Sequence, residues 1–552
     1  MMMKRNLAAL FVFLFVLMTS SALADALFVS RADGVGESVG LFMGTNYKTY
    51  LFLPAYMAEQ ENMLSLEGYS EAVIDGVSVK DGETTDKLRN GTQLTLKKGG
   101  RKTEVIVMAG SLPAVHLTTE SGSLDHIHEK KGNKEAAELV IVTADGTINY
   151  DAPIDSMKGH GNATFVYEKK SYQIKLEKKA QLLDMDESKS FVLVANQHEN
   201  TLLRNRITFE LADALDLPYT PDCRSVDLFV NGEFRGSYLL SDKIGISGGS
   251  VDIVELEKEI EKLNEEFLDR GGEPEKYGNN GYRKGTYKGA VWPKEPEDVT
   301  GGYLFELEYE QRYADEASGV VTQRGQAVVV KSPEQMTQSQ GEYVNNLLNS
   351  FERAIFAADG VDPQTGMHYT DFADFDSLVR KYMIEETCKN YDGNKSSQYF
   401  FKDTDEEDEM LYAGPVWDYD SAWGNYAPEG RPRVAVPQGM TVAENGESYS
   451  WWPALAKQGD FAAEVSEVYA GELRPLLEVL VGNKEAGETG IRSLDVYAAE
   501  LNDSAQMNFA RWRVLNSKAR ELKTGATYEE NIEYLRNWIM ERMIVLDAAW
   551  GK

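Results

Sequence analysis

Three aspartates between residues 390 and 420 have the residue type and the spacing that phosphoryl transfer needs. Asp392 follows Asn390-Tyr391 at the end of a predicted helix, and Asp418 and Asp420 belong to the run Gly414-Pro415-Val416-Trp417-Asp418-Tyr419-Asp420. Mg²⁺ prefers hard carboxylate oxygens, and an attacking hydroxyl needs an acceptor for its proton. Asp418 and Asp420 would share one side of a strand, and in a turn both could reach one ion. Capping of turns and helices is the simpler explanation for any one of these acids taken alone.

The second candidate segment is a glycine turn that could bind phosphate. It reads Lys158-Gly159-His160-Gly161-Asn162, and the run Lys169-Lys170-Ser171-Tyr172-Gln173-Ile174-Lys175-Leu176 follows it. Backbone N–H groups of such a turn can bind phosphate, and a lysine on the next strand can neutralise it. An ordinary hairpin with lysines on its exposed face has the same pattern. The chain has no GxxxxGK[ST], HRD or DFG sequence, which excludes an ordinary P-loop enzyme or protein kinase.

The composition argues against nucleic acid as a partner. Asp and Glu number 89 against 57 Lys and Arg, and the formal net charge is −32. Such a surface repels nucleic acid and anionic membranes. Solubility is the simplest interpretation of the charge, but the same charge would also steer a basic protein partner towards the chain.

The cysteines and histidines form no metal-binding pattern. Only Cys223 and Cys388 occur, with six histidines, and no CxxC or HExxH sequence is present. We therefore exclude a structural zinc site and a zinc hydrolase. The two cysteines could pair in an oxidising compartment, but their spacing does not decide it.

The first 24 residues have the pattern of a signal peptide. Lys4 and Arg5 precede an apolar run over residues 7–18, and Ala22-Leu23-Ala24 fits the cleavage rule. An uncleaved anchor is the alternative, but the run is short for a bilayer, and no later stretch approaches the roughly 20 apolar residues of a membrane helix. We expect a secreted or cell-surface protein that begins at Asp25, has no stable membrane insertion and carries a charge of −34 once Lys4 and Arg5 are removed.

The elements that must position the candidate residues fall into two regions. Residues 25–110 alternate short strands with turn residues, which indicates a small all-β sandwich module. Residues 111–552 begin with strands and end with helices, which indicates an α+β domain with two lobes. In this domain residues 255–300 are rich in Glu, Lys, Gly and Pro and suggest a solvated helix and a loop, whereas residues 377–552 are mostly helical. The expected strands are residues 114–118, 137–143, 171–176, 190–195, 225–230 and 236–240, and the expected helices include residues 201–215 and 528–550.

In this order, the segments resemble the CotH kinase family, which is named for a spore-coat protein. The resemblance covers residues 112–552 and implies an atypical, two-lobed protein-kinase-like fold that binds ATP with Mg²⁺ or Mn²⁺ and phosphorylates Ser or Thr of partner proteins. The segments that carry it are the Gly-x-Gly-Asn turn, the lysine-rich run to Leu176, Thr201-Leu202-Leu203-Arg204-Asn205, residues 230–238, Gly301-Gly302-Tyr303-Leu304, Asn390-x-Asp392, the Trp-Asp-x-Asp stretch and the terminal helix over residues 538–550.

The resemblance implies a role for each matching residue. Asp392 looks like the catalytic base, Asp418 like a metal ligand, and Asp420 like a second possible ligand. Lys170 or Lys175 would contact the nucleotide phosphates, with Lys175 slightly favoured. The remaining nucleotide-binding candidates are Gly159, Gly161, Asn162 and Arg204. Glu386 matches a family acid that could instead support its helix.

Departures from the family pattern leave two other functions open. Many relatives have Arg and Ser where this chain has His160 and Ala163, Ser397 stands where others have Asn, and Asp242 replaces a common Glu. A degenerate, kinase-like surface module that recognises a protein or a glycan is therefore the alternative to an exported kinase acting on basic, Ser-rich proteins of the spore coat or cell surface. A glycoside hydrolase that pairs Glu306 with Asp418 is the third class.

Overall fold

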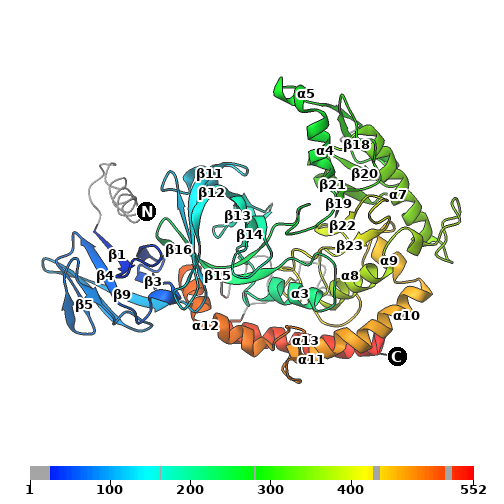
Figure 1. The fold of residues 1–552 in the computed structure, drawn as a ribbon. Helices are drawn as coiled ribbons and strands as arrows, with labels where there is room; N and C mark the ends of the chain where they lie inside the picture. Colours follow the sequence, from blue (N-terminus) through cyan, green and yellow to red (C-terminus); the bar gives the residue numbers. More distant parts are fainter. Residues whose placement is uncertain (1–24, 162, 279–280, 427–434, 516–524, 552) are drawn as a thin grey trace. The chain divides into compact units, whose positions relative to one another are not determined.

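The computed structural model describes residues 25–161, 163–278, 281–426, 435–515 and 525–551 (Figure 1). The predicted signal peptide and Asn162 lie outside these residues. The described chain divides into two compact units. The first contains the residues up to Gly122 with Glu138–Ala152 and Asp227–Gly236, and the second contains Ser123–Ala137, Pro153–Val226 and the residues from Ser237 onwards.

The first unit contains a nine-stranded sheet with the order β6-β5-β8-β9-β3-β2-β1-β4-β7. Period-two alternation places Leu27 and Val29 of β1, Leu64 of β4, and Leu94 and Leu96 of β8 in its core. The β-rich N-terminal region is thus confirmed, while its sandwich packing and its boundary at residue 110 stay predictions. The strands are β1 (Ala26–Arg31), β2 (Val39–Met43), β3 (Thr49–Leu53), β4 (Asn62–Glu67), β5 (Glu71–Ile74), β6 (Val77–Val79), β7 (Thr84–Thr85), β8 (Gln93–Lys98) and β9 (Arg101–Ala109).

Six of the next seven strands agree with the expected ones to within a few residues, whereas β12 was not expected. The seven strands are β10 (Ala114–Thr119), β11 (Lys134–Val142), β12 (Ile148–His160), β13 (Ser171–Ala180), β14 (Ser188–Val194), β15 (Cys223–Val230) and β16 (Glu233–Asp242). In the second unit β12 pairs antiparallel with β13, β13 with β14, and β14 with β16. Tyr172, Ile174 and Leu176 of β13 are buried, and Lys175 lies exposed on the other face of that strand, where Ser171 and Gln173 are buried.

The second unit also contains a seven-stranded sheet with the order β17-β18-β20-β21-β19-β22-β23. Helix α7 (Gln338–Phe356) packs against β18 and β20 (Figure 1). The loop expected in the second half of residues 255–300 is wrong, because two strands form there. In Thr286–Val291, Lys288 and Gly289 obscured the signal of the β-branched and aromatic residues. The strands are β17 (Glu275–Tyr277), β18 (Thr286–Val291), β19 (Tyr303–Glu308), β20 (Gly319–Val321), β21 (Ala327–Ser332), β22 (Gln398–Lys402) and β23 (Leu411–Ala413).

The helices follow the apolar periodicity of the sequence. Four of the five residues expected to face the core from residues 201–215 are buried, and Ala214 is partly buried. The last helix has the expected bounds, and helix α8 begins at an Asp374 side chain that accepts a hydrogen bond from the Ser377 N–H (2.7 Å). The α-helices besides α7 are α2 (Asp125–Glu129), α3 (Arg204–Asp213), α4 (Leu256–Leu263), α5 (Glu265–Asp269), α6 (Glu310–Asp315), α8 (Phe375–Thr387), α9 (Trp451–Leu455), α10 (Gly459–Val468), α11 (Arg474–Leu480), α12 (Leu494–Arg511) and α13 (Tyr528–Trp550). Short 3₁₀ turns occur at η1 (Ala55–Met57), η2 (Ala163–Val166) and η3 (Tyr369–Asp371), and a π-helical turn occurs at η5 (Tyr469–Leu473).

The mixed composition of helix (28%) and strand (29%) confirms the α+β character of the chain. The two-lobed arrangement of the kinase-like domain stays a prediction. Within the described residues, no helix is both long and apolar enough to cross a membrane.

Candidate active site

Asp392 lies in a tight turn that follows helix α8. The turn is held by the Asn390 side chain, whose Oδ1 accepts a hydrogen bond from the Asp392 N–H (3.1 Å). Burial and the nearby Asp418 carboxylate raise the pKa of Asp392 to about 6, while the positive charges of Lys395 and Arg312 act in the opposite direction. The structure therefore brings Asp392 and Asp418 close enough for one charge to act on the other.

Asp418 lies in an irregular segment after β23, with a left-handed backbone (φ +70°) that Asp tolerates better than most residues. Its Oδ2 accepts a hydrogen bond from the Ser397 hydroxyl (3.1 Å), and the Ser397 N–H donates to Glu306 Oε1 on β19 (3.2 Å). Asp420 lies in a turn, where its Oδ1 accepts a hydrogen bond from the Ser421 hydroxyl (3.2 Å). Neither Asp418 nor Asp420 lies in a strand, so the expected shared strand face is wrong.

Lys158, Gly159 and His160 of the predicted glycine turn are the last residues of β12 and pair with β13, so the chain turns only after His160. This end of β12 lies near the Trp-Asp segment, because the His160 ring packs edge-on against Trp417 with centroids 6.4 Å apart. Burial, together with the charges of Lys243, Lys131 and Lys158, lowers the pKa of His160 to about 4. Three lysines from different segments of the second unit are thus near enough to His160 for their charges to act on its ring.

Two further cations lie beside the acids of β19. Lys331 Nζ is 3.5 Å from Glu306 Oε2 and 3.2 Å from Glu316 Oε1, and Arg312 is 3.7 Å from Glu308 Oε1. Burial and the adjacent Glu306 carboxylate raise the pKa of Glu308 to about 8. The charges of Arg312, Lys331 and Lys158 all lower the pKa of Lys131. Arg312 and Lys331 are therefore within electrostatic range of at least one of the three lysines that act on His160. We call these five residues the cationic group: Lys131, Lys158, Lys243, Arg312 and Lys331.

Sequence reasoning missed most of the cationic group. Lys158 directly precedes Gly159 and was the one available signal, whereas the other four come from segments without a motif. Only tertiary folding places them beside one another.

Lys170 and Lys175 differ in their surroundings. Lys170 Nζ donates to the carbonyl oxygens of Phe165 (2.6 Å) and Tyr167 (2.9 Å), so it stabilises the turn that follows the glycines. Lys175 has a side chain 48% exposed, 3.9 Å from Asp155. The assignment of one of them to the nucleotide stays a prediction.

The glycines and Arg204 shape the fold around the turn. A Cβ at Gly159 would overlap the Phe165 ring, and Gly161 has a φ of +90°, so both positions favour glycine. Arg204 is buried and forms an ion pair with Glu199. The adjacent Asn205 accepts a hydrogen bond from the Tyr419 N–H at Oδ1 (2.7 Å), which supports the segment that contains Asp418.

Glu386 is buried and supports the end of α8. It accepts hydrogen bonds from the backbone N–H groups of Thr441, Val442 and Ala443 (2.7 to 2.8 Å) and pairs with Arg542 (2.9 Å). Burial raises its pKa above the ordinary value. These contacts agree with a supporting role rather than a ligand role.

The acids fit a divalent cation that is shared with a nucleotide. No group of three or more His, Cys, Asp or Glu side chains among the described residues is arranged to hold a metal by itself. Mg²⁺ in phosphotransferases needs only one or two carboxylates, because substrate phosphates complete its coordination. The repulsion between Asp392 and Asp418 is of the kind that a cation relieves, so we consider this pair compatible with a metal–nucleotide complex.

Cys223 and Cys388 are both buried free thiols. No disulfide forms between these two residues, and burial raises the pKa of the Cys388 thiol well above its ordinary value.

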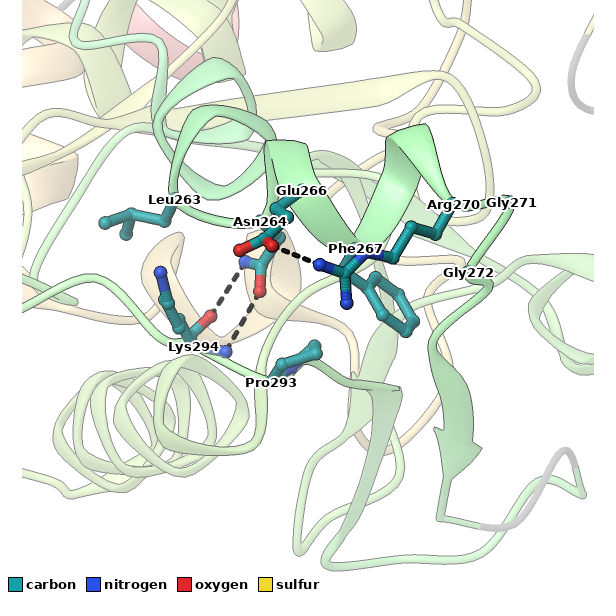
Figure 2. Close-up of a pocket in the computed structure, with 9 residues that line it drawn as sticks. All are labelled: Leu263, Asn264, Glu266, Phe267, Arg270, Gly271, Gly272, Pro293 and Lys294. Atoms are coloured by element: carbon teal, nitrogen blue, oxygen red, sulfur yellow. Dashed lines mark hydrogen bonds and ion pairs between the residues drawn. The ribbon is translucent and has the colours of Figure 1, made fainter.

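A separate pocket of about 390 Å³ lies in the region of α4 and α5 (Figure 2). Asn264 closes one side, where its Nδ2 donates to the Lys294 carbonyl (2.9 Å) and its Oδ1 accepts from the Lys294 N–H (3.0 Å). Its lining contains none of the candidate catalytic acids and none of the cationic group. The lining residues are Leu263, Asn264, Glu266, Phe267, Arg270, Gly271, Gly272, Pro293 and Lys294.

Comparison with known proteins identifies a family for the chain. A family model described as CotH kinase protein matches residues 157–546, which is well over half of the chain. A search of curated proteins finds no match. The matched range contains Asp392, Asp418, the glycine turn and four of the five residues of the cationic group.

Proposed function

Because the chain belongs to the CotH kinase family, we propose that it transfers the terminal phosphate of ATP to a Ser or Thr hydroxyl of a partner protein. Mg²⁺ or Mn²⁺ is the proposed cofactor. The observation that carries the proposal is the proximity of Asp392 and Asp418, two acids from different segments whose charges act on each other. The Ser396 N–H donates to the Asp392 carbonyl (3.2 Å), and the hydroxyl of the next residue, Ser397, donates to Asp418 (3.1 Å).

Asp392 is the proposed base. A pKa of about 6 makes it a better proton acceptor than an ordinary aspartate while it remains mostly ionised at neutral pH. Its carboxylate would accept the proton of the acceptor hydroxyl, and its place in a turn fixed by Asn390 limits the positions it can adopt.

Asp418 is the proposed metal ligand, with Asp420 as a second one. When bound, a divalent cation neutralises and bridges phosphate oxygens. The Ser397 hydroxyl orients Asp418 through its hydrogen bond to Oδ2.

The cationic group is the proposed binding site for the triphosphate. Phosphoryl transfer depends mainly on positioning and on electrostatic stabilisation of negative oxygens, which clustered lysines and arginine supply. Lys158 and Lys243 lie near the His160 turn, and Arg312 acts on Asp392, so the group extends from the turn to the proposed base.

The same observation favours an enzyme over a degenerate binding module. Two carboxylates held close together in a partly buried place destabilise the fold when no cation is present. A module that only recognises a protein or glycan surface has no need of that arrangement.

The acceptor and the location are further parts of the proposal. The formal charge of −32 supports a basic acceptor, and the N-terminal pattern supports export to the cell surface or the medium. A basic, Ser-rich protein of the spore coat or cell surface combines both features, and nucleic acid is not expected as a partner.

Incubation of the purified chain with labelled ATP, Mn²⁺ or Mg²⁺ and basic Ser-rich proteins tests the proposal. Label on Ser or Thr is expected with the unchanged protein. Asp392→Asn should abolish transfer and leave metal-dependent ATP binding nearly intact, whereas Asp418→Asn should weaken that binding. A folded protein that labels neither an acceptor nor itself would exclude the kinase function and favour the binding module.

A further inference from the structure

Glu385, in the last turn of α8, is fully buried and uses both oxygens of its carboxylate. Oε2 accepts a hydrogen bond from Asn390 Nδ2 (2.7 Å). Oε1 accepts one from the Tyr419 hydroxyl (2.5 Å) and lies 3.0 Å from Lys381 Nζ. One side chain therefore binds two segments that are far apart in the sequence.

Each of the two contacts leads to one of the catalytic acids. On one side, Asn390 uses its Oδ1 to hold the N–H of Asp392, so its amide connects Glu385 directly to the turn of the proposed base. On the other side, Tyr419 is the residue after Asp418. Its hydroxyl is held by Glu385 and its N–H by Asn205 Oδ1 (2.7 Å), so both ends of that residue are fixed.

Lys381 compensates the buried charge. Its ammonium lies 3.3 Å from the Pro415 carbonyl and 3.3 Å from the Tyr419 hydroxyl, and neither Lys381 nor Glu385 is exposed. A buried ion pair is often no more stable than apolar residues of the same volume. Its hydrogen bonds, in contrast, fix a geometry that apolar residues cannot specify.

We propose that Glu385 is a positioning residue that holds the base Asp392 and the metal ligand Asp418 in register with each other. The inference rests on the proposed function, because it assigns Glu385 a role in that same reaction. It predicts that the two contacts have separable kinetic effects. The Asn390 contact acts on the transfer step through Asp392, and the Tyr419 contact acts on the binding of metal and nucleotide through Asp418.

The test is steady-state kinetics of phosphate transfer with three variants. Tyr419→Phe removes one hydroxyl and should raise KM for the metal–ATP complex about tenfold, with kcat within about twofold, as expected for a hydrogen bond to a buried charge. Asn390→Ala should lower kcat about tenfold or more and leave KM nearly unchanged. Glu385→Gln should change both constants. Adding Tyr419→Phe to Glu385→Gln should raise KM no further, because both changes break the same contact.

Two matched variants control for a loss of stability. Glu352→Gln alters another buried glutamate, which accepts hydrogen bonds from the Thr322 hydroxyl (2.7 Å) and the Arg324 N–H (3.2 Å). Tyr369→Phe removes another buried hydroxyl, which donates to Asp460 (2.7 Å). Both should lower the unfolding temperature without changing kcat or KM.

The outcomes separate this inference from the proposed function. If the unchanged protein transfers phosphate and the Glu385, Asn390 and Tyr419 variants differ from it no more than the controls do, Glu385 is structural only and the inference is wrong. If Glu385→Gln fails to fold, the other two variants still test the inference. A higher KM in Tyr419→Phe and a lower kcat in Asn390→Ala would support it, and the absence of this difference would contradict it. Absence of transfer by the unchanged, folded protein would overturn the proposed function and the inference with it.

Discussion

Arg542 in α13 and Glu386 in α8 form a buried ion pair, with Nη2 and Oε1 2.9 Å apart. The guanidinium also donates to the backbone carbonyls of Pro437 (2.8 Å), Gly439 (2.6 Å) and Glu386 (2.7 Å). The last helix of the chain therefore holds α8 just before the turn that carries the proposed base.

Replacement of Arg542 tests how much this pair stabilises the second unit. Arg542→Met leaves the Glu386 charge buried without its partner, and we expect a loss of about 3 to 5 kcal/mol in the free energy of unfolding. Arg542→Lys should recover only part of this free energy, because an ammonium cannot reproduce the planar set of N–H donors of the guanidinium. Denaturant unfolding measures both. Glu472→Gln, which breaks the exposed pair with Arg380, is the control and should cost less than about 1 kcal/mol. Equal losses in Arg542→Met and the control would contradict the prediction.

Ser397 offers a test of the Asp418 geometry. Ser397→Ala removes the hydroxyl that donates to Asp418, so the affinity for Mn²⁺–ATP should fall several-fold. Ser397→Asn should keep that affinity, because Asn also donates a hydrogen bond and tolerates the left-handed backbone at this position (φ +57°). Calorimetric titration of both variants with Mn²⁺–ATP measures these affinities. An unchanged affinity in Ser397→Ala would show that the hydroxyl does not orient Asp418.

The raised pKa of Asp242 predicts that the free energy of unfolding depends on pH. Burial, with the charges of Asp222 and Asp186, raises the pKa of Asp242 to about 8 from its ordinary value of 3.8. Between these values the unfolded chain is ionised at this position and the folded chain is protonated, so its contribution to stability is present below pH 3.8 and is lost as pH rises towards 8. Asp242→Asn should therefore match the unchanged protein near pH 4 and exceed it by up to about 5 kcal/mol near pH 8.

Unfolding in denaturant at several pH values measures this difference. Asp408→Asn, at a position where the carboxylate is partly exposed, serves as the control. A difference between Asp242→Asn and the unchanged protein that is the same at pH 4 and pH 8 would contradict the raised pKa.

The elements of the fold were predictable where the signal is local. Helix α13 and strand β13 follow from apolar periodicity over a few residues; the bounds of α13 agree with it, and β13 begins at the expected residue but continues four residues further. Strands β17 and β18 were missed because Gly and Lys weakened the alternation, and packing against α7 stabilises β18 instead. For the site, Asp392 and Asp418 belong to compact motifs. Lys243 and Arg312 belong to no local motif, and only the tertiary fold brings them near the site.

Removal of metal tests the cofactor assignment. The acids around Asp418 repel a bare triphosphate, so ATP should bind only when a divalent cation is present. Calorimetry with Mn²⁺ and with EDTA compares the two conditions directly. Equal affinity in both would exclude the metal from nucleotide binding and leave the cationic group as the whole site.

The identity of the lysines that contact phosphate is the most discriminating prediction. The family resemblance assigns Lys170 or Lys175, whereas the structure places Lys158 and Lys243 in the cationic group beside the glycine turn. A lysine contributes to phosphate binding only if its ammonium reaches the anion, so Lys158→Met and Lys243→Met should each weaken metal–ATP binding about tenfold. Lys175→Met should change it less than about twofold, because this side chain is 48% exposed and lies near Asp155.

Lys170→Met separates folding from binding in the same experiment. Its ammonium donates to two backbone carbonyls, so the variant should lower the unfolding temperature and weaken binding only as far as the turn loosens. Rising salt should reduce the affinity of the unchanged protein more than that of Lys158→Met or Lys243→Met, because each of these variants has lost one screened charge. Normal affinity in both Lys158→Met and Lys243→Met, together with a tenfold loss in Lys175→Met, would move the phosphate site from the cationic group to the exposed face of β13.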